Sequence, residues 1–140
     1  MIRYENLKLI SETRLKEAKV LYQNGLYDGA AYICGYVLET ALKARICKNL
    51  NIGEYPDDGK DKTIFSSHDF DRLLLLSGLQ GKITLTARNK KRFANWSLLT
   101  SWKPERRYAV GVYKKSNVED LFEALEDSKS GLFTWLKKLW

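Results

Sequence analysis

Three side chains in this 140-residue sequence carry nucleophilic or proton-transferring chemistry suited to neutral pH: His68, Cys34 and Cys47. A zinc site normally takes four ligands, largely cysteine and histidine, and three such residues cannot supply them without carboxylates. A Ser-His-Asp triad would have to use His68, and the nucleophile-elbow pattern G-x-S-x-G is absent. The glycine-rich phosphate and dinucleotide loops G-x-x-x-x-G-K-S/T and G-x-G-x-x-G are absent as well. The sequence therefore predicts no metal site, no cofactor and no catalytic residues of these kinds.

The two cysteines lie thirteen positions apart in one segment with helical periodicity. A helix rises 1.5 Å per residue, so roughly 20 Å separates them along the axis, which is too far for a disulfide. We expect reduced thiols packed in the core, and a reactive cysteine is the alternative.

The excess positive charge is concentrated in one stretch. The formal net charge is +7 at pH 7, and residues 82–115 contain ten basic residues against the single acid Glu105. The sequence before this stretch is neutral, and the sequence after it is slightly acidic. A local positive field attracts polyanions, so the stretch is a candidate surface for a nucleotide, an RNA or the acidic face of a protein.

Aromatic residues are interleaved with these cations, an arrangement that suits stacked bases beside bound phosphates. Helical spacing places Phe93 and Trp96 inward, whereas the residues after them fall in a predicted loop. The candidate binding residues are Arg106 and Arg107 for phosphate, Tyr108 or Trp102 for stacking, and Lys91, Arg92 and Lys103 for electrostatic support. The alternative is a solvated basic face whose aromatic side chains belong to the core.

Apolar periodicity predicts helices over nearly the whole chain. The predicted helices cover about residues 4–24, 28–50, 66–77, 84–102 and 116–139. Capping residues support three of the starts: Asp28 for the second helix, Ser66 with Asp69 for the third, and Ser116 with Glu119 for the last. The polar stretch between Asn51 and Phe65, with its glycine and proline, predicts a loop, and the sequence leaves open whether residues 54–62 fold over a site.

Short connections make amphipathic helices antiparallel neighbours. The expected fold is therefore an all-α up-and-down bundle of four to five helices, formed as a single domain over residues 1–140. No stretch approaches the ~18 apolar residues that a membrane span requires. The first residues show no secretory signal pattern, so a cytoplasmic location is expected.

Four segments together resemble a known family. Residues 26–32 read LYDGAAY, residues 39–44 read ETALKA, residues 67–74 read SHDFDRLL, and Arg107 is followed by tyrosine. In this order and spacing they resemble the HEPN domains, small helical bundles of prokaryotes and some eukaryotes. The resemblance extends over about residues 8–138 and implies a HEPN-like helical bundle.

The resemblance also identifies a missing motif. Many HEPN domains are metal-independent ribonucleases with the pattern Arg-x(4–6)-His, in which histidine moves protons and arginine holds the scissile phosphate. Counting forward from Arg107, the histidine positions hold Val112, Tyr113 and Lys114. Counting back from His68, the arginine positions hold Asp61, Lys62 and Thr63. The chain is therefore similar to the branch without the motif, which is often encoded beside a minimal nucleotidyltransferase in a toxin–antitoxin-like pair.

That branch is suggested to bind nucleotide or nucleic acid rather than cleave it. HEPN proteins commonly form homodimers through long helices, and the apolar C-terminal helix permits one with Trp135, Leu136, Leu139 and Trp140. The resemblance further implies that His68 is a structural residue, packed or hydrogen-bonded near a helix start.

Glu39 and Lys43 form an i,i+4 pair with the glutamate first, the orientation that stabilises an exposed helix surface. The alternative is that the two side chains line a groove or an interface.

Three functions remain open. The preferred hypothesis is a non-catalytic HEPN-type module that binds nucleotide or RNA through the basic surface at residues 82–115. The second is a protein-interaction subunit that docks on a nucleotidyltransferase or another acidic partner. The third is a ribonuclease with substituted catalytic residues, His68 or Tyr113.

Overall fold

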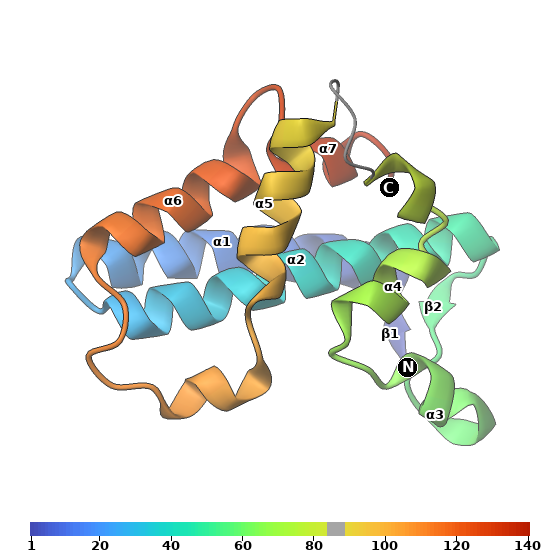
Figure 1. Cartoon of the computed structure of the whole chain (residues 1–140). Helices are drawn as coiled ribbons and strands as arrows, with labels where there is room; N and C mark the ends of the chain where they lie inside the picture. The colour runs from blue at the N-terminus through green and yellow to red at the C-terminus, as the bar shows by residue number, and fades with distance from the viewer. Residues whose placement is uncertain (84–88) are drawn as a thin grey trace.

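The computed structural model describes residues 1–83 and 89–140 (Figure 1). Within these residues the chain forms seven α-helices, three short 3-10 helices and one two-stranded sheet. The expected all-α bundle is confirmed. It contains more and shorter helices than predicted, because several of the expected segments are interrupted by side-chain caps and turns.

The two longest helices form the centre of the bundle. Helix α1 (Tyr4–Gln23) and helix α2 (Tyr27–Leu50) match the first two predicted helices and pack side by side as a helical hairpin (Figure 1). The hydroxyl of Ser11 on α1, which is fully buried, donates to the carbonyl oxygen of Val37 on α2 at 2.8 Å. Helix α2 contacts every other major helix, so its small and branched apolar residues make up much of the core.

A two-stranded sheet lies at one end of this hairpin. Strand β1 (Ile2–Arg3) pairs antiparallel with strand β2 (Glu54–Tyr55). The region from Asn51 to Phe65 also contains the 3-10 helix η1 (Gly59–Asp61) and helix α3 (Lys62–Phe65). The prediction of a loop there is wrong where these short elements form, and the buried Tyr55 side chain joins them, because its hydroxyl donates to the carbonyl oxygen of Phe65 at 2.9 Å.

Helix α4 (Phe70–Leu76) begins later than predicted. The side chain of Asp69, rather than Ser66, caps its start by accepting the backbone N–H groups of Asp71 at 3.0 Å and Arg72 at 3.2 Å. The cap satisfies two of the donors that a helix leaves free at its N-terminus.

Helix α5 (Lys90–Thr100) corresponds to the predicted segment 84–102, of which residues 84–88 lie outside the described part of the chain. It runs across α2 rather than along it (Figure 1). The chain then turns through the 3-10 helix η3 (Pro104–Tyr108), which begins at proline after an extended Lys103. Proline disfavours helical backbone in the residue before it, which accounts for this break.

The predicted C-terminal helix is in fact two, α6 (Lys115–Glu126) and α7 (Leu132–Lys137). Between them, the carboxylate of Asp127 accepts the backbone N–H groups of Lys129 at 3.1 Å and Ser130 at 2.8 Å. Gly131 lies so close to this turn that an added Cβ would sit 2.5 Å from the nitrogen of Asp127. Helical periodicity continues through the turn, which is why the sequence alone suggested one helix.

The start of α6 also differs from the prediction. No bond joins Ser116 and Glu119 as a capping box among the described contacts; instead the side-chain oxygen of Asn117 accepts the N–H of Lys114 at 2.8 Å. The helix therefore begins at Lys115.

Both cysteines are free and buried, as expected. Burial raises the pKa of Cys34 to about 12, and it raises the pKa of Cys47 to about 11. At neutral pH both thiols are therefore protonated and behave as small apolar side chains.

Asp28 has a different role from the one expected. It lies in the first turn of α2, and its carboxylate accepts the backbone N–H groups of Gly111 at 2.6 Å, Val112 at 3.0 Å and Tyr113 at 2.9 Å. These bonds, with that to Tyr113 the largest contribution, lower the pKa of Asp28. The aspartate thus fastens the segment between η3 and α6 to the beginning of α2.

Replacing Asp28 with alanine is expected to release this segment. The amide hydrogens of residues 111–113 should exchange faster in Asp28→Ala at pH 7, because they lose their acceptor. Hydrogen exchange measures the effect, and Glu12→Ala, an exposed carboxylate on α1, is the control. Unchanged exchange at residues 111–113 would show that Asp28 does not hold them.

The same carboxylate predicts a pH dependence of stability. Its folded-state pKa lies below the ordinary value of about 3.9, so its stabilising contribution is present above that pH. It is lost as the pH falls through the folded-state pKa. The difference in free energy of unfolding between wild type and Asp28→Ala should therefore shrink as the solution is acidified below about pH 4.

Candidate functional site

The structure separates the predicted cationic residues into two groups. Lys103, Arg106 and Arg107 lie on or beside η3, whereas Lys91 and Arg92 lie in the first turn of α5. These groups flank opposite ends of an 11-residue helix, which is roughly 16 Å long. The seven candidates therefore do not form one contiguous site.

The two cations at the start of α5 already have neighbours. The guanidinium of Arg92 stacks 4.5 Å from the ring centre of Trp135, and its Nε is buried without a hydrogen-bond partner in the described chain. The ammonium of Lys91 lies 4.0 Å from a carboxylate oxygen of Glu123. Arg92 thus packs α5 against α7.

The other three cations, Lys103, Arg106 and Arg107, are called here the η3 cationic cluster. None of them forms an ion pair within 4.0 Å with a carboxylate in the described parts of the chain. The guanidinium of Arg107 lies 4.9 Å from the ring centre of Tyr108, and that of Arg106 lies 5.8 Å from the ring centre of Tyr113. The cluster therefore offers positive charge to an external anion.

The two aromatic candidates for stacking have different surroundings. Trp102 is 6% exposed, and its indole N–H donates to the carbonyl oxygen of Tyr32 at 2.9 Å. Its ring lies 5.1 Å from that of Tyr36, and a Cβ added to Gly35 would lie 2.3 Å from it. Tyr108 is 74% exposed. Trp102 is thus a packing residue, whereas the ring of Tyr108 is exposed and can stack on a ligand.

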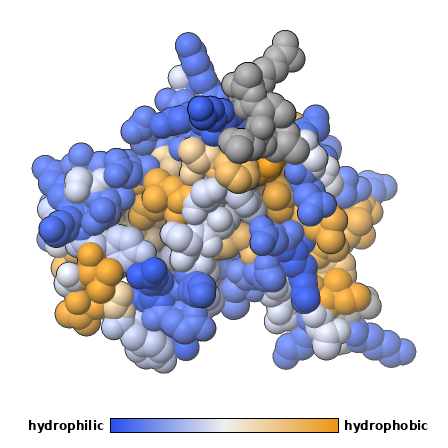
Figure 2. All heavy atoms as spheres, in the orientation of Figure 1, coloured by the Kyte–Doolittle hydropathy of each residue, from blue (hydrophilic) through white to orange (hydrophobic). Residues whose placement is uncertain are grey.

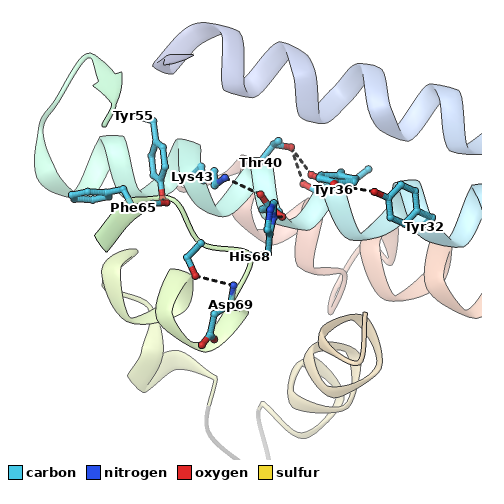
Figure 3. A network of polar contacts seen from close by, with 11 residues as sticks. Tyr32, Tyr36, Thr40, Lys43, Tyr55, Phe65, His68 and Asp69 are labelled. Atoms are coloured by element: carbon cyan, nitrogen blue, oxygen red, sulfur yellow. Dashed lines mark hydrogen bonds and ion pairs between the residues drawn. The ribbon is translucent and has the colours of Figure 1, made fainter. Parts of the chain in front are cut away.

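Two tyrosines on α2 extend the site beyond the residues that the sequence suggested. The hydroxyls of Tyr32 and Tyr36 lie 3.0 Å apart on successive turns (Figure 3). Burial raises the pKa of Tyr36 to about 12, although the charge of Arg107 acts in the opposite direction. Helix α2 contacts η3 directly, which agrees with a position of Arg107 near the tyrosine pair. Tyr32 belongs to one of the segments that supported the family resemblance, whereas Tyr36 lies between two of them.

Two hollows share Trp102 as a wall. The first, of about 300 Å³, lies between α2, α5, α6 and the segment after η3, and Arg106 and Tyr113 line it. The second, of about 240 Å³, is lined by Lys103 together with His68 and Asp69. The η3 cationic cluster therefore contributes a cation to each hollow.

Glu39 is not on an exposed helix surface, as an ordinary i,i+4 pair would require. It is 2% exposed, and its two carboxylate oxygens lie 2.8 Å from the ammonium of Lys43 and 2.8 Å from Nδ1 of His68 (Figure 3). Glu39 and Lys43 also line a groove of about 500 Å³ between α1 and α2, which agrees with the alternative interpretation. The expectation that His68 is hydrogen-bonded is confirmed.

The positions where a ribonuclease histidine was sought are occupied by backbone-anchored residues. The N–H groups of Val112 and Tyr113 are held by Asp28, and the Tyr113 side chain faces Arg106. No group of three or more His, Cys, Asp or Glu side chains that could hold a metal ion occurs among the described residues.

The comparison with protein families agrees with this architecture. A model of the HEPN domain matches residues 4–127. The chain belongs to the HEPN family. The matched part of this HEPN chain runs from the start of α1 to the turn after α6, so it includes η3 and both hollows beside it. None of the curated proteins and none of the solved structures compared with this chain matches it.

The described helices of this HEPN domain include none long and apolar enough to span a membrane. Its apolar C-terminal residues pack within the chain itself. Leu136 is 1% exposed, and the ring of Trp140 lies 5.8 Å from that of Phe133 in an edge-to-face contact.

The sequence reasoning missed the polar residues of α6 that line the first hollow, Asn117 and Asp120. Their spacing of three on an amphipathic helix is a signal that they share a face. It does not show that the face borders a cavity, because the other walls come from α2 and α5.

Because Glu39 is buried, we expect that replacing Lys43 and replacing His68 lower the free energy of unfolding by different amounts. Lys43→Met leaves a buried carboxylate without its ammonium and should lower the free energy of unfolding by about 3 kcal/mol. His68→Ala should cost about 1 kcal/mol, because the His68 side chain is 52% exposed and Lys43 remains. Urea unfolding measures both. An equal or larger loss for His68→Ala would contradict this assignment.

Proposed function

We propose that this HEPN domain is a non-catalytic module that binds the phosphates of a nucleotide or RNA through the η3 cationic cluster. The observation that carries the proposal is the set of three cations on or beside one short turn, none paired with a described carboxylate. Arginine presents a planar fork of donors that matches phosphate oxygens.

The surroundings of the cluster support this ligand class. The exposed ring of Tyr108 lies against Arg107, so a base can stack beside a bound phosphate. The Asp28 bonds hold the segment that follows η3, and preorganised backbone reduces the entropy lost on binding.

The residues at the motif positions support a role without RNA cleavage. A proton acceptor that operates near neutral pH is needed to activate the RNA 2′-hydroxyl. The three positions after Arg107 hold Val112, Tyr113 and Lys114 in place of histidine. A tyrosine hydroxyl is a poor proton acceptor at neutral pH.

A salt titration tests the proposal. A fluorescein-labelled single-stranded RNA should bind, and contacts with three phosphates imply an affinity loss of about twentyfold between 50 and 200 mM salt. Arg107→Gln should weaken binding and make the salt dependence shallower, because one phosphate contact is removed. Fluorescence anisotropy in the presence of EDTA measures the affinity and its salt dependence. The RNA should still be intact at the end of the titration.

The matched control is Lys16→Gln, which removes a positive charge from the exposed face of α1. It should leave the salt dependence unchanged. A lack of affinity for RNA and for nucleotides at low salt would refute the proposal, and so would RNA that is cut during the titration.

The exposed apolar residues of the same segment favour a second candidate function, a subunit that docks on an acidic protein such as a nucleotidyltransferase. Val110 is 89% exposed and Val112 is 52% exposed. Figure 2 shows a hydrophobic patch over the segment that joins η3 to α6. Apolar contacts ringed by arginine are typical of protein interfaces.

For this second function the expected pattern of results differs. Arg107→Glu and Val110→Asp should each abolish capture of a purified minimal nucleotidyltransferase in a pull-down. RNA binding should then be absent from the wild type. Capture that survives both substitutions would exclude this segment as the interface.

A further inference from the structure

The hollow between α2, α5 and α6, called here the α2–α6 cavity, has the dimensions of a small ligand pocket. Its volume is about 300 Å³, at the lower limit of the range of about 300–1,000 Å³ that such pockets occupy. The short side chain of Ala31 lines the cavity on the α2 side, and Leu99 and Leu121 form apolar walls. A cavity of this size and lining suits one flat ring system rather than a strand of RNA.

The polar edge of the α2–α6 cavity comes from one face of α6. Asn117 and Asp120 lie three residues apart on this helix, so their side chains are neighbours. The side-chain oxygen of Asn117 accepts the N–H of Lys114, so the NH₂ group is the part of this side chain that can donate to a ligand. The carboxylate of Asp120 forms no ion pair with a described residue. The edge therefore offers a donor beside a charged acceptor.

Guanine carries the complementary pattern. Its O6 accepts a hydrogen bond, and its N1–H and N2–H groups donate side by side. The Asn117 amide can donate to O6 while the Asp120 carboxylate accepts from both N–H groups. Adenine offers one donor and one acceptor along the same edge, so it makes one bond fewer.

The phosphate of such a ligand has a cationic partner in the lining of the cavity. Arg106 lines the α2–α6 cavity and belongs to the η3 cationic cluster. A base that contacts Asn117 and Asp120 therefore shares its cavity with a cation that can bind the attached phosphate. We propose that the α2–α6 cavity is a base pocket for a guanine nucleotide, an inference that rests on the proposed function and names its ligand.

Calorimetric titration of the full chain with GMP and with AMP at low salt tests the pocket. GMP should bind about tenfold more tightly than AMP or better, because guanine forms one more hydrogen bond, and that bond is to the charged Asp120 carboxylate. Asp120→Asn should lower the affinity for GMP by about tenfold and bring the GMP-to-AMP affinity ratio close to one. Asn117→Asp retains the acceptor for Lys114 and removes the donor, so it should weaken GMP as well.

The matched control is Glu123→Gln, which removes the same charge from the same helix outside the α2–α6 cavity. It should leave the ratio of GMP to AMP affinity unchanged. Because Asp120 and Glu123 are both exposed, neither substitution threatens folding. Circular dichroism of each variant verifies this.

The outcomes separate this inference from the proposed function. Salt-dependent RNA binding with equal affinities for GMP and AMP, or a ratio that Asp120→Asn leaves unchanged, would overturn the base pocket and leave phosphate binding intact. Absence of binding to RNA and to both nucleotides would overturn the two together. A GMP preference that is lost in Asp120→Asn and kept in Glu123→Gln establishes the pocket.

Discussion

The position of the η3 cationic cluster depends on the packing of Trp102 against helix α2. The indole lies over Gly35, where any side chain would collide with it, and its N–H is held by the carbonyl oxygen of Tyr32. This contact fixes the chain at the point where α5 ends and η3 begins. A large residue at position 35 would displace Trp102 and, with it, the wall that the two hollows share.

Asp28, which lies seven residues before Gly35 on α2, provides the second attachment of the η3 region to this helix. Its carboxylate holds the backbone after η3, while Trp102 holds the backbone before it. The segment between them is therefore anchored to α2 at both ends although its tip is exposed. Exposed Arg107 and Val110 lie on an ordered turn, which is the arrangement expected of a binding loop on a rigid scaffold.

Local patterns in the sequence were sufficient to predict the helices α1 and α2 and the all-α class. They were insufficient wherever a long-range contact decides the structure. Asp28 has the spacing of a helix cap, but its partners lie more than eighty residues away. The i,i+4 spacing of Glu39 and Lys43 predicts an ion pair on the helix surface, yet His68 and the neighbouring helices bury the glutamate. Asp127 ends α6 by forming a turn, but the hydrophobic periodicity continues through this turn and therefore does not indicate it.

Charge along the chain and charge in space also differ. Residues 82–115 form one basic stretch in the sequence, but α5 carries its two ends apart, and Arg92 is used to pack Trp135. What remains is a compact group of three cations beside a cavity with an acidic rim. A long polyanion is best held by a continuous basic track, whereas the candidate cations here divide into two groups, one at the start of α5 and one on or beside η3. A cation group next to a carboxylate and an amide instead matches a ligand with a phosphate at one end and hydrogen-bond donors at the other.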